Sequence, residues 1–150
     1  MAVAFNLYDT YRKVAADPTR AAAIAGTLKV MFTAAGYVPN QNTDQFVTTP
    51  IAFEVTGTGY TARGNACTTP TWTGPSGTGD NTYDANDPAT WTQNAAGFTN
   101  ARRAIVYFDT AVNGTSQLVG YTADFGADLS MVPADVTVVF NALGIYTGPR

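Results

Sequence analysis

The sequence contains no histidine and only one cysteine, Cys67. Without histidine the chain cannot build a Ser-His-Asp or Cys-His catalytic arrangement, nor a metal site with imidazole ligands. One cysteine excludes an intramolecular disulfide and a Cys-x-x-Cys site. Carboxylates are the main catalytic groups that remain, as ten aspartates and Glu54. These absences argue against most enzyme classes, and we expect a protein without catalytic activity, cofactor or metal.

Charge is also scarce, because 13% of the residues are charged whereas an average soluble domain has about 25%. The eight lysines and arginines are scattered and the net charge is −3, so we do not expect nucleic-acid binding. No apolar run approaches the roughly 18 residues of a membrane span. The first residues lack the basic segment and apolar core of a secretory signal. We therefore expect synthesis in a cytoplasm and no membrane partner.

The length fits one domain, residues 1–150, with an N-terminal helical arm over 1–26 and a β core over 27–150. Apolar residues at three-residue spacing predict a short helix over 4–16. The pair Asp17-Pro18 is typical of the start of a second short helix.

From residue 27 the period changes to two, which predicts a strand over 27–33 with Leu28, Val30 and Phe32 facing the core. The dipeptide Asn113-Gly114 predicts a tight hairpin turn. Further strands are predicted over 51–56, 69–73, 82–92, 101–110, 116–125 and 136–140. These features predict a mainly β fold, an antiparallel sandwich or small barrel with a short N-terminal helix and long loops.

Two glycine- or aspartate-rich segments invite a ligand-binding interpretation. The spacing of Gly57, Gly59 and Gly64 matches no nucleotide-binding fingerprint, and a tight turn anchored by Tyr60 is favoured. Residues Asp80 to Asp87 gather carboxylate and amide side chains, which are common in turns but are also calcium ligands. We favour turn chemistry there, with calcium binding as the alternative.

Other reactive side chains are interpreted as structural. Asp124 and Asp128 could form the carboxylate pair of a glycoside hydrolase, but nothing nearby in the sequence indicates that either pKa is shifted. The dipeptide Arg102-Arg103 is expected to pair with nearby aspartates. Cys67 is expected to be an unreactive thiol, because no basic cluster adjoins it.

Aromatic residues fall mostly in predicted loops or at strand ends. They are typical of surfaces that contact protein or carbohydrate, but aromatic side chains also close a core beneath long loops, and both interpretations stay open. The polar stretch after residue 33 is long for a simple connection. The residues concerned are Tyr37, Phe46, Trp72, Tyr83, Trp91, Phe98 and Tyr146.

A set of segments in a fixed order covers nearly the whole chain: GTLKVMFTAAGYVPNQNTDQF, FEVTGTGYTARG, WTQNAAGFTNARRAIVYFDT, LVGYTADFGAD and VTVVFNALGI. This pattern resembles a family of small virion proteins of tailed bacteriophages. The resemblance implies a structural role in the virion, and it brings no catalytic residues. The segment over 64–80 is longer than in the simpler members.

Three hypotheses follow. The first is a capsid decoration protein, assembled in the host cytoplasm as a homotrimer, that binds the outer shell and bridges copies of the major capsid protein. The second is a tail tube, tip or fibre module that contacts host glycan, and the third, far behind, is a carboxylate hydrolase. For the first hypothesis the expected contact residues are Phe5, Leu7, Tyr8 and Tyr11 in the arm and Tyr37, Phe46 and Trp72 in loops. Removing residues 1–16 is then expected to abolish shell binding while the β core stays folded.

Overall fold

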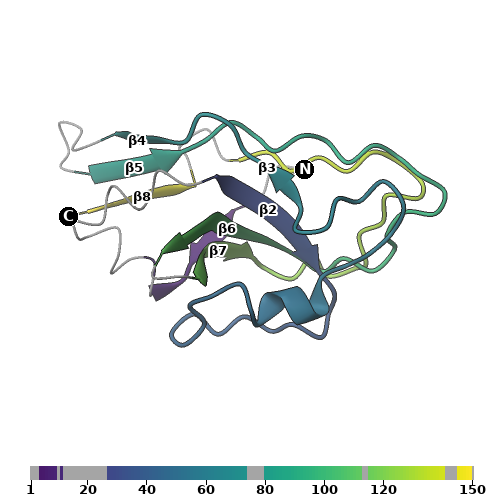
Figure 1. The fold of residues 1–150 in the computed structure, drawn as a ribbon, viewed down its shortest axis with the longest axis horizontal. Coiled ribbons are helices and arrows are strands. Elements are labelled where there is room, and N and C mark those ends of the chain that lie inside the picture. Colours follow the sequence, from purple (N-terminus) through teal and green to yellow (C-terminus); the bar gives the residue numbers. More distant parts are fainter. Residues whose placement is uncertain are drawn as a thin grey trace.

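The computed structural model describes residues 4–9, 11, 27–73, 80–112, 115–140 and 145–149. In this part of the chain the fold is mainly β and its strands form two antiparallel sheets (Figure 1). The larger sheet has five strands in the order β1-β7-β6-β2-β3. These strands are β1 (Phe5–Leu7), β2 (Leu28–Thr33), β3 (Asn65–Ala66), β6 (Arg103–Val112) and β7 (Thr115–Thr122). The predicted mainly β class is confirmed.

The hairpin predicted from Asn113-Gly114 is confirmed by the strands on either side of it. β6 and β7 pair antiparallel, and Val112 lies opposite Thr115. The register shifts beyond Val106, which marks an irregularity in the pairing that lets both strands bend. The two turn residues themselves lie outside the described residues.

Strand β2 confirms the predicted alternation but buries more than one face. Leu28, Val30 and Phe32 are fully buried as expected. Met31 and Thr33, expected on an exposed face, are fully buried too. The sheet is therefore covered on both sides.

Each face of the large sheet carries its own hydrophobic cluster. The first cluster joins β2 and β6 to Tyr83 of the small sheet and to the long loops, and the rings of Trp91 and Phe98 pack tilted against Phe32 at centroid distances of 4.7 and 5.3 Å. The second cluster lies on the opposite face and contains Tyr8, Met31, Tyr37, Val47, Ile105, Tyr107 and Leu118. The aromatic rings of the chain are therefore divided between two buried clusters, one on each face of the sheet.

The smaller sheet has the order β4-β5-β8, with β4 at Thr71–Thr73, β5 at Asp80–Asp84 and β8 at Tyr146–Pro149. The strand expected over 69–73 is confirmed as β4. The expected edge strand over 82–92 is wrong in two respects, because β5 is central and ends at Asp84. The strand expected over 136–140 is also wrong, because that range holds only isolated bridges, at Val139 and at Val136, which pairs with Trp91.

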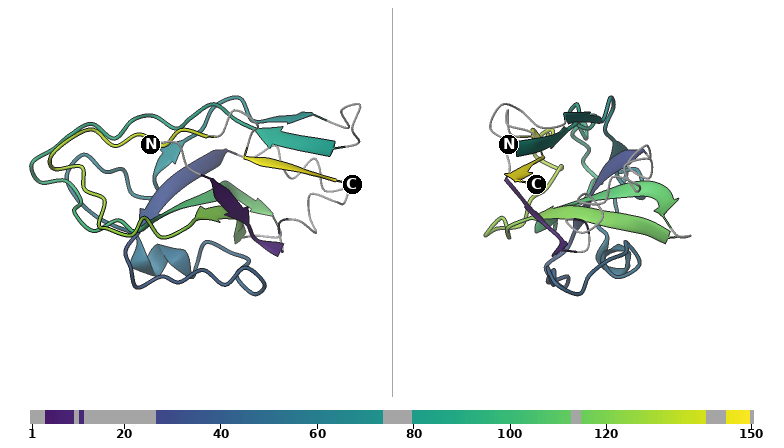
Figure 2. Two further views of the ribbon diagram at one scale, coloured as in Figure 1. Left: turned by 180° about the vertical axis from the view of Figure 1, so that it is seen from behind. Right: turned by 90° about the vertical axis from the view of Figure 1, so that its left-hand side faces the viewer.

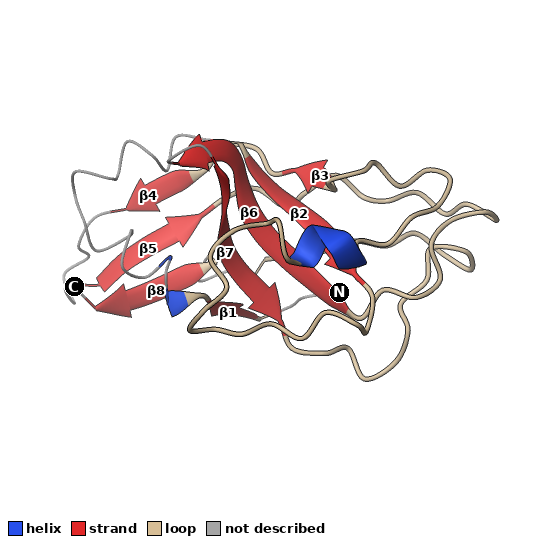
Figure 3. Cartoon of the chain, turned by 60° about the horizontal axis from the view of Figure 1, so that its bottom comes forward, coloured by secondary structure: helices blue, strands red, loops and turns tan. Residues whose placement is uncertain are grey.

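The predicted strand over 51–56 is replaced by a short 3-10 helix, η2 (Pro50–Phe53). Pro50 stands at its first position, where a fixed φ suits a helical start and no N–H is needed. Figures 1 and 3 place η2, within the segment that follows β2, over the face of the large sheet opposite the small sheet. We call residues 34–53 the covering segment.

The helix predicted over 4–16 is wrong for Phe5–Leu7, which form β1 and pair with β7. Phe5 lies opposite Thr122 and Leu7 opposite Gly120, and only after β1 does the backbone turn helical, at Asp9 and Tyr11. The three-residue spacing that suggested a helix instead distributes side chains to both clusters. The expected separation of an arm from a β core is therefore wrong for β1, and residues 12–26 lie outside the described residues.

Two long loop segments run side by side at the end of the molecule away from the small sheet (Figures 1 and 2). Isolated antiparallel bridges join Trp91 to Val136 and Ala101 to Leu129. Gln93 adds hydrogen bonds to Asp135 and to the Val132 carbonyl, at 2.7 Å each. Buried side chains of both loops also belong to the first cluster, so these loops extend the core.

Candidate functional site

The contact residues expected near the N-terminus lie mostly inside the chain. Leu7 is 3% exposed, and Tyr8 and Tyr11 are fully buried. Phe5 is half-buried, with its ring 5.6 Å from that of Phe140. These four side chains complete this chain's own core, so their removal would damage the fold as well as any contact surface.

Tyr37, also an expected contact residue, is buried in the second cluster and belongs to a hydrogen-bonded chain. Its hydroxyl lies 2.8 Å from that of Tyr8 and donates to Asp44 Oδ2 at 2.7 Å. Burial raises the pKa of both tyrosines above the ordinary value, and the hydrogen bond between them raises that of Tyr8 further. These hydrogen bonds tie the N-terminal segment to the covering segment. A further bond joins the same two segments, because the backbone N–H of Asp9 donates to the carbonyl of Gln41 at 2.9 Å.

The remaining expected contact residues are Phe46 and Trp72. Phe46 is half-buried in the covering segment and forms an isolated bridge with Gln117 of β7. Trp72 lies in β4, opposite Tyr83, and its side chain lies outside the described residues. Of the seven expected residues, Phe46 alone has a described side chain in a loop that is not buried.

Two exposed hydrophobic residues that the sequence analysis did not single out stand in the covering segment. Val38 is 73% exposed and Phe53 is 38% exposed, and they are the large hydrophobics most open to solvent in the described part of the chain. The ring of Phe53 stacks on that of Tyr37 at 6.1 Å, so its exposed face is held on a rigid base. Val38 could have been noticed as a lone apolar residue in a polar loop, but Phe53 was hidden inside the wrongly predicted strand. We call Val38, Phe46 and Phe53 the apolar surface of the covering segment.

For three of the other aromatic residues, the structure favours a core beneath the loops over a contact surface. Tyr83 is fully buried, and Trp91 and Phe98 are 1% exposed. Tyr60 is half-buried against Trp91 and Phe98. These rings close the core beneath the long loops, so they do not form a glycan-binding platform in this chain. The side chain of Tyr146 lies outside the described residues.

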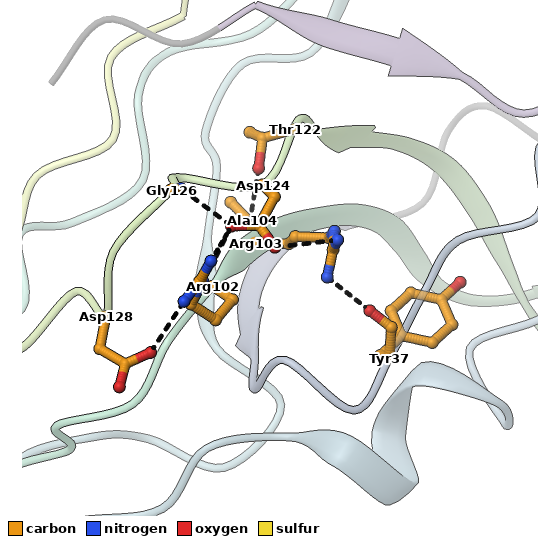
Figure 4. Close-up of polar contacts among 8 residues, drawn as sticks. All are labelled: Tyr37, Arg102, Arg103, Ala104, Thr122, Asp124, Gly126 and Asp128. Atoms are coloured by element: carbon orange, nitrogen blue, oxygen red, sulfur yellow. Dashed lines mark hydrogen bonds and ion pairs between the residues drawn. The ribbon is translucent and has the colours of Figure 1, made fainter.

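The predicted pairing of Arg102 and Arg103 with aspartates is confirmed (Figure 4). Arg102 lies 2.6 Å from Asp124 and 3.5 Å from Asp128, and Arg103 lies 3.0 Å from Asp124. The N–H of Gly126 and the guanidinium of Arg102 lower the pKa of Asp124 below its ordinary value. A carboxyl held in its ionised form is the opposite of what a general acid for glycoside hydrolysis requires.

The same cluster fixes the start of β6 to the covering segment. Arg103 donates from Nη1 to the carbonyl of Tyr37 at 2.7 Å (Figure 4). Thr122 accepts a hydrogen bond from the N–H of Ala104 at 3.0 Å, beside the same network. The arginine pair therefore acts as a structural brace.

The glycine motif after β2 forms the tight turn that the sequence favoured. The N–H of Tyr60 donates to the carbonyl of Gly57 at 3.1 Å, and Gly59 adopts a φ of +81°. The hydroxyl of Tyr60 donates to Glu54 at 2.9 Å and anchors the turn to the residue that directly follows the covering segment.

The aspartates between 80 and 87 serve the backbone. Asp84 accepts from the N–H of Ala85 at 2.9 Å, and Asp87 accepts from the N–H of Phe140 at 2.7 Å. Asn86 donates to Thr68 and Thr69 at 3.2 and 2.8 Å. Within the described ranges no three acidic or cysteine side chains gather in a way that could hold a metal ion.

Cys67 is buried, and burial together with the charge of Asp87 raises the pKa of its thiol to about 12. Because the thiolate is the reactive form, we expect almost no labelling by a disulfide reagent at pH 8 in the native state and rapid labelling in denaturant. The measurement is thiol release followed by absorbance. A native labelling rate close to the denatured rate would contradict the burial of this side chain.

No family model, no curated protein and no solved structure matches this chain. In the described part of the chain, no helix has the length and apolar character needed to cross a membrane.

Proposed function

We propose that this chain is a non-enzymatic structural protein of a tailed-phage virion, and that it decorates the capsid by binding the major capsid protein and copies of itself as a homotrimer. Assembly takes place in the host cytoplasm. The class of function is supported by the ordered segments in which the sequence resembles phage virion proteins. We also propose that the two sheets form an antiparallel sandwich around the first cluster.

The exposure of Val38 and Phe53 on the covering segment is the observation that supports this segment as the surface in contact with the capsid. The expected N-terminal contacts are buried, so they are replaced in this proposal by the apolar surface of the covering segment. Apolar residues on a rigid base lose little side-chain entropy on binding, and they are typical of the central residues of protein interfaces.

The decoration role is tested first by the number of copies per particle. Quantitative mass spectrometry of purified virions, and of heads without tails, should give a simple symmetric ratio to the major capsid protein in both samples. A few copies that disappear with the tails would overturn the decoration role and support the tail alternative. Absence from both samples would overturn the virion assignment itself.

The contact surface is tested by the double variant Val38→Asp, Phe53→Asp. We expect binding to shells that lack this chain to weaken at least about tenfold, because two apolar contacts are replaced by charges that would be buried unpaired. Co-sedimentation with shells measures the affinity, and circular dichroism shows whether the fold is retained.

The matched control is Thr48→Asp, which places one charge on an exposed position of the same segment. It should bind nearly as well as the unchanged chain. Equal loss in the control and in the double variant would indicate a general charge effect. Undiminished binding of the folded double variant would remove this surface from the contact.

A further inference from the structure

Arg63 stands in a backbone conformation that is unusual for its type. Its φ is +71°, in the left-handed region that a side chain disfavours. The next residue, Gly64, has a φ of +73° and donates its N–H to the carbonyl of Thr61 at 2.8 Å. A residue other than glycine held in this region is often found where a side chain must be presented to a ligand or partner.

Side chains from two other elements hold Arg63 in this position. Its N–H donates to Glu54 Oε1 at 2.6 Å, and its carbonyl accepts from the hydroxyl of Tyr107 at 2.7 Å. The same Glu54 oxygen also accepts from Tyr60, at 2.9 Å. The backbone of Arg63 is thus fixed on one side to Glu54, directly after the covering segment, and on the other side to β6.

The other described cations form ion pairs with aspartates of the same chain, and the guanidinium of Arg63 does not. Lys29 lies 2.6 Å from Asp109, and Arg102 and Arg103 lie within 3.0 Å of Asp124. No such ion pair joins Arg63 to an acidic group in the described residues, and its Nη1 is buried without a hydrogen-bond partner. A buried charged donor without a partner is costly, so its persistence needs an explanation.

We propose that Arg63 is a binding site for a carboxylate group supplied by an acidic side chain of a neighbouring protein. Arg63 is half-buried with Nη1 enclosed, so a group from outside is received at the part of the side chain that meets solvent and offsets the charge of the same delocalised cation. A planar guanidinium matches the two oxygens of a carboxylate. Glu54 lies beside the site and the net charge is −3, so a singly charged carboxylate fits better than a phosphate dianion. The identity of the neighbour as a virion subunit rests on the proposed function, but the site itself does not.

The site is tested on the isolated full-length chain by following the arginine Nε–H signals in NMR spectra. Sodium acetate is titrated against sodium chloride at equal ionic strength. We expect the Arg63 signal to move with acetate and to approach saturation, while those of Arg102 and Arg103 stay nearly still because their aspartates already occupy them. Equal, linear movement of all three signals would overturn the site.

The partner is tested by binding to shells that lack this chain. Arg63→Gln should weaken binding about tenfold and Arg63→Lys by less, because lysine keeps the charge but loses the two-pronged geometry. Lys29→Gln, which alters a cation already paired with Asp109 and outside the arginine brace, should bind as the unchanged chain does. Saturable acetate binding together with no shell binding by any form would retain the site and reject the proposed function. Shell binding that is unaffected by Arg63→Gln would reject the carboxylate partner alone.

Discussion

Replacing Gly64 with alanine should destabilise the protein by about 3 to 5 kcal/mol. Losses of this size are typical of substitutions that the native backbone cannot accommodate. The φ of +73° is unfavourable for alanine, and the added Cβ would lie 1.8 Å from the carbonyl oxygen of Val30. That oxygen belongs to the backbone of β2, in the middle of the large sheet, so it cannot move aside as a side chain would. Thermal unfolding should show a decrease in Tm of about 10 °C.

The matched control is Gly126→Ala. Gly126 has a similar φ of +79°, but no atom lies within 4 Å of the position its Cβ would take. Alanine there should cost only the left-handed conformation, about 1 to 2 kcal/mol. The difference between the two variants measures the close packing of the turn on β2. Equal losses would mean that this close approach does not exist in solution.

The second large effect is expected for Tyr8→Ala. Tyr8 is fully buried, its ring lies 4.9 Å from that of Tyr121, and its hydroxyl meets that of Tyr37. Truncation of a buried aromatic side chain leaves a cavity, and we expect a loss of about 3 to 5 kcal/mol in the free energy of unfolding. Denaturant unfolding followed by tyrosine and tryptophan fluorescence measures it.

Tyr8→Phe is the control, because it keeps the ring and removes only the hydroxyl. It should cost about 1 kcal/mol, the usual net value of one hydrogen bond. If Tyr8→Ala were as mild as Tyr8→Phe, the side chain would not be part of the core, and the N-terminal segment would again be a candidate for contact with a partner. The expected result instead means that removing residues 1–16 unfolds part of the protein, which corrects the expectation of an independent arm.

The strands that could be predicted are those with a strong local signal. β2 alternates cleanly, and β6 and β7 are apolar runs joined by Asn-Gly. β1 could not be predicted, because Phe5–Leu7 become a strand only through pairing with β7, at the other end of the sequence. The segment over 51–56 was predicted as a strand from its alternation, but it contains part of the 3-10 helix η2. Pro50 favours the start of this helix, and the helix lies within the covering segment. In both cases tertiary contacts decide between two local possibilities.

The site was less predictable than the fold. Arginine–aspartate pairing around Arg102 was predicted from the presence of nearby aspartates, and the glycine turn was predicted because its spacing matches no nucleotide-binding fingerprint. Burial of Tyr37 was not predicted, because an aromatic residue in a loop is equally consistent with a core beneath the loop and with an exposed surface. Burial of Leu7 and Tyr8 was not predicted either, because these residues were expected in the helix of a separate arm. Arg63 gave no local signal at all, since its isolation depends on where every acidic side chain lies in three dimensions.

The pairing of β1 with β7 has a consequence for how the protein is made. Phe5 is translated long before its partner Thr122, because the two residues lie far apart in the sequence. At roughly 5 to 20 residues per second the N-terminal segment waits several seconds before the strand it pairs with exists. During that interval Leu7, Tyr8 and Tyr11 have no core to enter, and they are open to chaperones or to other nascent chains. Completion of the large sheet therefore has to wait until β7 has been synthesised.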